Sequence, residues 1–329
     1  MDYLCKPIAM ERVVKYTVCH GSGNRFVMID AVAQREACDG ADFAAWAVGL
    51  CAKDTPIGGA DGLLMLVEFG GGYAMRMFNP DGSEAEMCGN GIRCAARQAQ
   101  QYIGRDEFSV WSGGQEYRIT HERPVWPGVE TYGVEIPVSL QSGDFGFAAD
   151  GAEFIGRPIE RLHEGLRFTA LNLGNPHITA CVERIDYDML TELGERVKEL
   201  RDEFPNGVNV SLFEHTGPQR IFVATYERGA GITASCGTAM TASATAAALL
   251  GLTEFGKEVE VRNRGGAVRC LPRREADGRL VTRLTGNATF ESEGTFVATG
   301  EAEVGDIRTV RTADEEQSAY DAFVNSITR

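Results

Sequence analysis

The sequence contains one local pattern twice, and this repeat limits the possible fold more than any other feature. In the first copy, a β-rich segment at 73–78 leads through a turn rich in glycine and asparagine to Cys88-Gly-Asn-Gly and a helical stretch. In the second, a β-rich segment at 220–226 leads through a Gly-rich turn to Cys236-Gly-Thr and another helical stretch. The two cysteines are 148 residues apart in a chain of 329. This spacing indicates an internal duplication with one shared site between the halves.

The duplication predicts that each helix is wrapped by the strands of its own half. We expect an N-terminal half at 1–133, to which the segment 294–329 returns, and a C-terminal half at 134–293. The β-rich segment at 131–137 is expected to cross between them. The tail from Thr312 is typical of a short polar helix added to the core.

Hydrophobic periodicity predicts further elements. The segment 25–32 has the β-rich composition of a strand, and the segments 42–53 and 186–203 repeat apolar residues at helical spacing. Gly194, inside the last of these, counts slightly against a helix there. The residues that share the apolar face of 186–203 are Leu190, Leu193, Val197 and Leu200.

Composition argues against several classes of protein. The chain has 47 acidic and 32 basic residues without a basic cluster, so nucleic acids and anionic membranes are poor partners. Its nine cysteines form no CxxC pair and histidines are scarce, which argues against a metal site. Residues 1–12 lack the apolar core of a signal peptide, and the charge-free run 236–253 is too small and polar to span a membrane. We therefore expect a reducing, cytoplasmic location.

The paired cysteines predict proton-transfer chemistry. A cysteine at the start of a helix lies near the positive end of the helix dipole and near free N–H groups, and both lower the pKa of its thiol. The glycines that follow let the backbone approach a carboxylate held between two helix ends. If one sulfur is a thiolate and the other a thiol, one removes a proton from a carbon and the other delivers one from the opposite face. A single cysteine before a helix is usually structural, so the prediction depends on the matched pair.

At these two motifs the sequence resembles the diaminopimelate epimerases. The run Phe78–Glu84 followed by Cys88–Cys94 is similar to the first active-site signature of that family. The run Tyr226–Gly231 followed by Cys236–Thr238 is similar to the second. The further blocks that fit in order are His20–Asn24, Gly59–Gly62, Gly174–His177 and Phe204–Asn209. The resemblance spans about residues 15–300 and rests on several motifs together, which makes it specific.

The resemblance implies an α/β (α+β) fold of two pseudo-symmetric domains, each a strongly curved sheet or barrel around a central helix, with a cleft between them. It also implies an isomerase of lysine and peptidoglycan biosynthesis that converts LL- to meso-diaminopimelate without pyridoxal phosphate, any other cofactor or a metal. Cys88 and Cys236 are then the acid–base pair, and His177 and Glu227 set the protonation state of the two thiols. A homodimer is implied as well, for which the sequence shows no interface pattern.

The resemblance further implies which residues bind the amino-acid substrate. The side chains that would hold mainly its distal amino and carboxylate groups are Asn24, Asn79, Asn175, Asn209 and Arg228. The backbone groups that would hold the reacting carboxylate belong to Gly89, Asn90, Gly237 and Thr238. An arginine offers a bidentate fork to a carboxylate, and an asparagine offers donor and acceptor together. Without the resemblance, asparagines in turns, a lone histidine and an adjacent Glu–Arg pair would be interpreted as structural.

The sequence departs from the family pattern at three places. Arg25 stands where the family often has aspartate, Ile232 where many members have glutamate, and Ala239-Met240 where Gly-Ala is usual. None of these changes removes a proposed catalytic group. Arg25 and Met240 could alter the shape of the pocket or the fit of the second helix, so the exact substrate stays open.

Two other functions stay open at this stage. A two-cysteine racemase for histidine, proline or hydroxyproline would use the same chemistry, although the first motif is Cys-Gly-Asn and not the Cys-Gly-His of the proline type. The other possibility is a non-catalytic binding module, or a redox sensor that uses a disulfide between Cys88 and Cys236. Arg228 and the asparagines favour an enzyme whose substrate has a second charged end.

Overall fold

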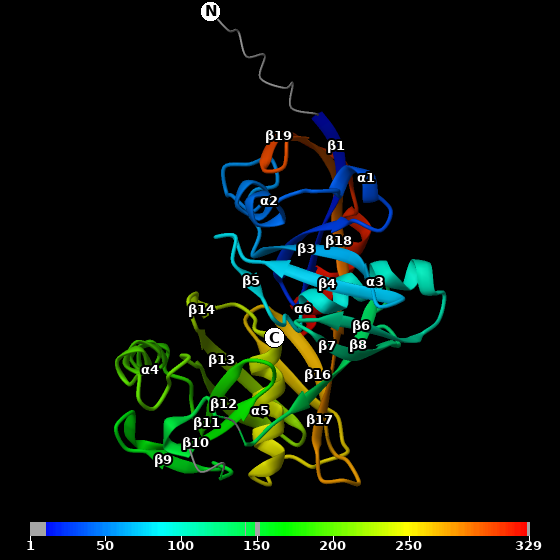
Figure 1. Ribbon diagram of the computed structural model, residues 1–329. Coiled ribbons are helices and arrows are strands. Elements are labelled where there is room, and N and C mark those ends of the chain that lie inside the picture. Colours follow the sequence, from blue (N-terminus) through cyan, green and yellow to red (C-terminus); the bar gives the residue numbers. More distant parts are fainter. Residues whose placement is uncertain (1–10, 142, 149–151, 328–329) are drawn as a thin grey trace, which may run out of the picture.

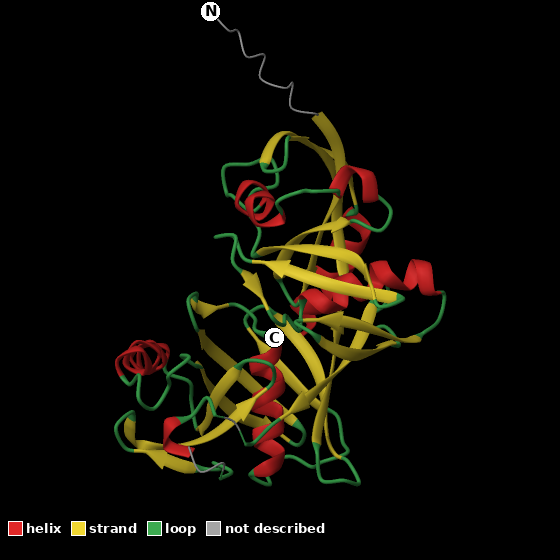
Figure 2. Cartoon of the chain, in the orientation of Figure 1, coloured by secondary structure: helices red, strands yellow, loops and turns green. Residues whose placement is uncertain are grey.

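The chain folds into two strand-rich halves that lie one above the other and share one continuous sheet (Figure 1). The computed structural model describes residues 11–141, 143–148 and 152–327, so the expectation about a signal peptide at 1–12 falls largely outside the described residues. In the described residues the sheet contains 19 strands. A sheet of this size curls because its strands twist. Figure 2 shows the strands bending around helices in both halves, as the predicted α+β class requires.

The N-terminal half is built from the first strands of the chain and two strands near its end. Its strands are β1 (Glu11–Gly21), β2 (Asn24–Asp30), β3 (Gly62–Phe69), β4 (Gly72–Phe78), β5 (Glu84–Ala85), β6 (Glu107–Ser112), β7 (Gln115–His121), β18 (Thr289–Thr299) and β19 (Glu303–Thr312). Its helices are α1 (Arg35–Cys38), α2 (Phe43–Leu50), α3 (Gly91–Ile103) and α6 (Asp314–Ile327). β1 pairs antiparallel with both β2 and β18, so the end of the chain returns to this half.

The C-terminal half contains the second copy of the pattern. Its strands are β9 (Arg157–Ile159), β10 (His163–Asn172), β11 (Pro176–Val182), β12 (Asn209–Gly217), β13 (Arg220–Glu227), β14 (Gly231–Thr233), β15 (Val259–Asn263) and β16 (Gly266–Arg274). Its helices are the 3₁₀ turn Gly146–Ala148, α4 (Tyr187–Glu199) and α5 (Gly237–Leu249). α5 packs against β11, β12, β13 and β16, whereas α4 packs against β12, β13 and β14.

Two strands carry the chain between the halves. β8 (Thr131–Val138) leaves the N-terminal half, where it pairs with β7, and β17 (Leu280–Asn287) returns to it. The two strands pair antiparallel along all eight residues of each. The sheet is therefore continuous across the junction, and the boundaries expected at 133 and 293 fall inside β8 and β18.

The central helix α5 is buried on every side. Twelve of its 13 residues are buried, and they are mostly alanine, threonine, serine and glycine. Its hydroxyl groups are satisfied locally or by neighbouring strands: Thr241 donates to the Gly237 carbonyl at 2.8 Å, and Thr245 lies 2.8 Å from the Thr282 hydroxyl. Small side chains let strands approach from all directions, which explains why this run lacks an apolar stripe. No helix in the described ranges is long and apolar enough to cross a membrane.

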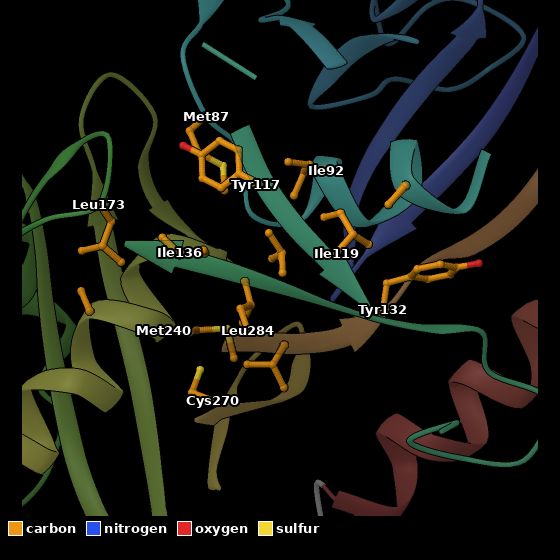
Figure 3. Close-up of a cluster of buried hydrophobic side chains, with 14 of the residues drawn as sticks. Met87, Ile92, Tyr117, Ile119, Tyr132, Ile136, Leu173, Met240, Cys270 and Leu284 are labelled. Carbon is orange, nitrogen blue, oxygen red and sulfur yellow. The ribbon is translucent and has the colours of Figure 1, made fainter. Parts of the chain in front are cut away.

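The largest apolar cluster joins the two halves. Ile92 and Ile119 come from the N-terminal half, and Met240, Cys270 and Leu284 come from the second helix, β16 and β17. Figure 3 shows these side chains around the strands that connect the halves. Because this core is shared, each half depends on the other for part of its buried surface.

The elements expected from periodicity are present with small shifts in their ends. The strand expected at 25–32 is β2, and the helices expected at 42–53 and 186–203 are α2 and α4. Gly194 lies within α4 for a steric reason: a Cβ at this position would lie 2.1 Å from Cγ of Tyr226. The polar tail is α6, which packs against β16 and β18.

Candidate active site

The two cysteine–glycine turns meet at the junction of the halves. α3 begins at Gly91 and α5 at Gly237, so Cys88 and Cys236 lie at the starts of the two central helices. A Cβ at Gly89 would lie 3.5 Å from the carbonyl carbon of Gly237, and a Cβ at Gly237 would lie 2.9 Å from Oδ1 of Asn90. The turns thus pack against each other, and the glycines permit this close approach.

The Cys88 thiol lies partly buried above the first turn of α3. Its sulfur accepts a hydrogen bond from the Gly91 N–H at 3.3 Å and lies 3.9 Å from Oδ1 of Asn24. Burial raises the pKa of Cys88 to about 11, and the N–H groups of Gly91 and Asn90 oppose this rise. The N–H groups at the helix start therefore lower the thiol pKa, as expected, but the loss of solvent raises it by more.

The Cys236 thiol is more enclosed, with 8 % of the residue exposed. Its sulfur lies 3.5 Å from the Thr238 hydroxyl. Burial and then the charge of Glu227 raise its pKa well above the ordinary value, although the Ala239 N–H opposes the rise. Both thiols are therefore protonated at neutral pH when no substrate is bound.

Glu227 at the end of β13 is near both thiols. Its carboxylate accepts hydrogen bonds from the Thr233 hydroxyl and from the Cys236 thiol. Its charge also raises the pKa of Cys88. Burial raises the pKa of Glu227 itself, and the two hydrogen bonds hold the pKa down. One carboxylate thus couples electrostatically to both sulfurs from the C-terminal half.

His177 on β11 is fully buried and neutral. Burial and the charge of Arg228 lower its pKa to about 3. Its Nε2 lies 2.9 Å from Oδ1 of Asn175, which accepts the proton of that nitrogen. Nδ1 has no hydrogen-bond partner among the described residues and so keeps a free lone pair. In the substrate-free protein the imidazole therefore stays neutral, with one unused acceptor, and the low pKa makes it a weak base.

Two of the expected asparagines lie at the meeting turns. Asn24 donates to the Asp61 carboxylate at 2.7 Å and accepts from the Asn90 amide at 3.4 Å. Asn175 donates to the Thr238 hydroxyl at 3.3 Å. These contacts join the expected substrate-binding side chains to the backbone segments of both turns.

The other expected binding residues lie further out. Asn209 is buried and accepts from the Arg228 N–H at 2.9 Å. The Arg228 side chain is exposed and donates to the Asn206 carbonyl. Asn79 donates to the Ser83 hydroxyl at 2.9 Å, a contact within its own turn after β4. Arg228 and Asn209 therefore lie together, whereas the described contacts of Asn79 do not join it to the others.

Two residues without a predicted role also shape the site. Asp61 accepts from the Asn24 side chain and, at 2.8 Å, from the Arg25 N–H, so it fixes the turn after β1. Thr233 holds the Glu227 carboxylate. Asp61 lies within the Gly-Ala-Asp-Gly block, which could have drawn attention to it, whereas no sequence signal marks Thr233.

The structure shows the surroundings of the three residues that depart from the family pattern. The Arg25 guanidinium forms an ion pair with Glu291 at 2.7 Å and donates to the Ile57 carbonyl at 2.9 Å. Met240 is buried, and its sulfur lies 3.0 Å from Nδ2 of Asn263. Ile232 is 36 % exposed on the short strand β14. Arg25 thus ties a loop to β18, and Met240 fills the base of the second turn.

The arrangement can remove a proton and return one to the same small molecule. Two thiols at facing helix starts offer an acid and a base once one of them is ionised, and the nearby N–H groups can hold a carboxylate. Among the described residues, no group of three or more His, Cys, Asp or Glu side chains could hold a metal ion.

Comparisons with known proteins assign the chain to a family. A sequence profile described as "Diaminopimelate epimerase" matches residues 16–124 and 169–291. The diaminopimelate epimerase of Clostridium acetobutylicum is 36% identical over 84% of this chain and 84% of its own. The enzyme of the same name from Lactiplantibacillus plantarum is 35% identical over 96% of this chain and 99% of its own.

Solved structures share the fold at low sequence identity. A phenazine biosynthesis protein of the PhzF family from Bacillus anthracis has a TM-score of 0.59 at 15% identity, covering 86% of this chain and 99% of its own. A methylitaconate-delta-isomerase has a TM-score of 0.57 at 10% identity, covering 88% of this chain and 96% of its own. These likenesses concern the fold alone and confirm the predicted fold class. From the sequence matches over both halves, we conclude that the chain belongs to the diaminopimelate epimerase family.

Proposed function

We propose that this protein is an isomerase that converts LL- to meso-diaminopimelate by proton transfer between Cys88 and Cys236, in lysine and peptidoglycan biosynthesis. The named relatives, which match most of the chain, support the substrate. The observation that carries the mechanism is the packing of the Cys88 and Cys236 turns against each other, with Glu227 near both thiols.

In the proposed reaction, the substrate carboxylate binds between the helix starts, at the N–H groups of the two turns, Gly89–Asn90 and Gly237–Thr238. Glu227 accepts the proton of the Cys236 thiol through their hydrogen bond, which leaves a thiolate. The thiolate removes the hydrogen from the reacting carbon as a proton, and the electron pair moves toward the carboxylate held by the N–H groups. Cys88 then delivers its proton to the opposite face. In the reverse direction the two sulfurs exchange roles, and we propose that His177, together with Glu227, helps to set the protonation state of the thiols.

We propose that the arginine and asparagine side chains around the cysteine turns bind the distal amino and carboxylate groups of the substrate. Arg228 is exposed and offers a fork to a second carboxylate. Asn24, Asn79, Asn175 and Asn209 supply donors and acceptors for the ammonium and carboxylate groups. A histidine or proline racemase has no need for this second charged end, which favours diaminopimelate as the substrate.

The test is incubation of the purified protein with LL-diaminopimelate in heavy water. We expect meso product that carries deuterium at the inverted carbon, because a thiol exchanges its proton with solvent. Histidine, proline and hydroxyproline are assayed in parallel by chiral separation. Absence of labelled meso product, or inversion of one of the other amino acids instead, would refute the proposed substrate.

The proposal includes the setting in which the enzyme works. The eight cysteines in the described ranges are free thiols, which fits a reducing cytoplasm. We also propose two domains divided near 133 and 293, and a homodimer as the resemblance implies. Light scattering on the purified protein tests the assembly, since it measures the molar mass directly.

A further inference from the structure

Arg93 is a fully buried cation on α3, one turn after Cys88. None of the ion pairs among the described residues includes it, so its guanidinium is buried without a carboxylate within ion-pair distance. Burial of an unpaired charge is destabilising, and a neutral side chain would fill the same space at lower cost. The position therefore indicates a functional requirement.

The Arg93 guanidinium holds the turn that follows Cys88. Nη1 donates to the Gly89 carbonyl at 2.9 Å, and Nη2 donates to Oδ1 of Asn90 at 3.1 Å. In a trans peptide the C=O and the next N–H point in opposite directions. With the Gly89 carbonyl fixed toward Arg93, the Asn90 N–H therefore points away from it, to the side where the Cys88 sulfur lies.

The same guanidinium joins this turn to two other segments. Nε donates to the Asn287 carbonyl at 3.0 Å at the end of β17, and Nη2 lies 3.1 Å from the Ser22 hydroxyl in the loop before Asn24. A planar fork can satisfy acceptors in several directions at once, which a lysine ammonium cannot do in the same geometry.

Two glycines make room for the guanidinium. A Cβ at Gly21 would lie 2.8 Å from Nη2 of Arg93, and a Cβ at Gly286 would lie 3.1 Å from its Cζ. Neither glycine has a positive φ, so the backbone conformation does not require glycine at these positions. Arg93 shares this crowding with one other neighbour at each position, because the Cβ would also lie 2.7 Å from the Asn90 carbonyl oxygen at Gly21 and 3.0 Å from Cγ1 of Val268 at Gly286.

Several ionisable groups face Arg93, and one of them is the His20 imidazole, whose pKa is lowered by burial and also by the charge of Arg93. The others are the thiols of Cys88, Cys94 and Cys270 and the phenol of Tyr320. Cys88 is the one among them that the proposed reaction ionises. Its other charged neighbour is Glu227, which opposes ionisation of the thiol from the far side.

We propose that Arg93 is a positioning residue for the reaction: its guanidinium fixes the Cys88–Asn90 turn for the substrate carboxylate and supplies the positive charge that stabilises the Cys88 thiolate. The part that concerns the substrate rests on the proposed function, whereas the part that concerns the thiol does not. Loss of the cation leaves Glu227 as the remaining strong charge near Cys88, so its thiol ionises less readily.

The test compares Arg93→Met and Arg93→Lys with the wild type and with Arg97→Met as the control. Arg97 lies on the same helix one turn later and pairs with Glu316, so its loss removes an equal charge away from the thiol. The rate of Cys88 alkylation by iodoacetamide is followed by peptide mass spectrometry from pH 7 to 11. In parallel, kcat and KM for LL-diaminopimelate are measured.

For Arg93→Met we expect alkylation of Cys88 about ten-fold slower near pH 8.5, which is one unit in thiol pKa, and a matching fall in kcat. For Arg93→Lys we expect a nearly unchanged pH profile of alkylation with a raised KM, since the charge remains and the fork is lost. The control should alkylate at the wild-type rate. Wild-type alkylation together with wild-type kcat in Arg93→Met overturns the proposal.

Two further outcomes, a variant that does not fold and a wild type without activity, still give a result. If circular dichroism shows that Arg93→Met does not fold, the Arg93→Lys comparison decides, and an unchanged KM and kcat there overturns the positioning role. If the wild type does not epimerise diaminopimelate, the proposed function fails, yet the alkylation profiles still test the effect of Arg93 on the thiol.

Discussion

At the scale of single residues, the thiols of Cys88 and Cys236 are set by two opposing effects. Backbone N–H groups at the helix starts favour the thiolates, but burial raises both pKa values more strongly. Because burial outweighs the N–H groups, both thiols stay protonated until a bound ligand adds its own charges to the site. In the proposed mechanism, Glu227 controls when Cys236 loses its proton, because the two are hydrogen bonded.

The hydroxyl of Thr233 should therefore tune the pH dependence of the enzyme. It donates to the Glu227 carboxylate and lowers its pKa, so Thr233→Val should raise that pKa. Glu227 must be ionised to accept a proton, and a raised pKa moves the acidic limb of kcat/KM to higher pH by about one unit, as for a lost hydrogen bond. Profiles from pH 5 to 9 check this, with Thr191→Val on the surface of α4 as the control. An acidic limb that stays in place would show that Glu227 does not act as the proton acceptor.

His177 should make the folded state less stable in acid. Its pKa is lowered to about 3, so between pH 6.5 and 3 the unfolded chain binds a proton that the native state does not. The free energy of unfolding then falls with falling pH in this window, by on the order of 1 kcal/mol per pH unit from this residue. Urea unfolding at pH 7, 6, 5 and 4 should show a shallower slope for His177→Gln than for the wild type. Equal slopes would mean that the histidine is not buried in its neutral form.

At the scale of elements, local sequence patterns predicted several helices and strands. They did not reveal features that depend on residues far away in the sequence. Composition and periodicity alone predict β2, α2 and α4. The two cysteine–glycine turns predict the helices α3 and α5 that come after them. Gly194 argues against a helix in the sequence because its reason lies elsewhere, in the ring of Tyr226. Likewise, the long strands β18 and β19 pair with partners hundreds of residues away or with each other, which periodicity does not reveal.

Gly194→Ala is a sharp test of that packing. In most helix interiors this change stabilises by about 1 kcal/mol, but here the new Cβ would overlap the ring of Tyr226. We expect a loss of about 1–3 kcal/mol, as for other overpacked sites, and a lower kcat, because Tyr226 precedes Glu227. Chemical denaturation and steady-state kinetics measure the two effects. The double variant Gly194→Ala with Tyr226→Leu should recover part of the stability, and no recovery would contradict the steric explanation.

At the scale of the whole molecule, the sequence predicted one shared site but not everything that supports it. The matched turns at Cys88 and Cys236 imply that the halves face each other. The role of α6 could not be predicted, because its partners are distant in sequence. Tyr320 on this helix packs against the His20 ring at 4.5 Å and donates to the Gly265 carbonyl at 2.9 Å. The tail thus holds together one loop from each half behind the site.

Tyr320→Ala should therefore affect both stability and substrate binding. The side chain is almost fully buried, and removal of a large aromatic group from a core costs about 3 kcal/mol or more. We expect a lower melting temperature and a raised KM for diaminopimelate, since the His20 and Gly265 loops lose their common support. Tyr320→Phe, which keeps the ring, should restore most of the stability. A wild-type KM in Tyr320→Ala would show that the tail is only a structural cover.

The pairing of β8 with β17 limits how the molecule can move. The only described backbone connections between the halves are these two strands, hydrogen bonded to each other along their whole length. A two-stranded ribbon twists and bends readily but does not lengthen, because its backbone is already extended. Any opening of the halves would therefore be a rotation of one half about this ribbon, with the distance between the halves at the ribbon held constant. Such a rotation would keep the halves in one register, so that the same pair of sulfur atoms would face each new substrate molecule.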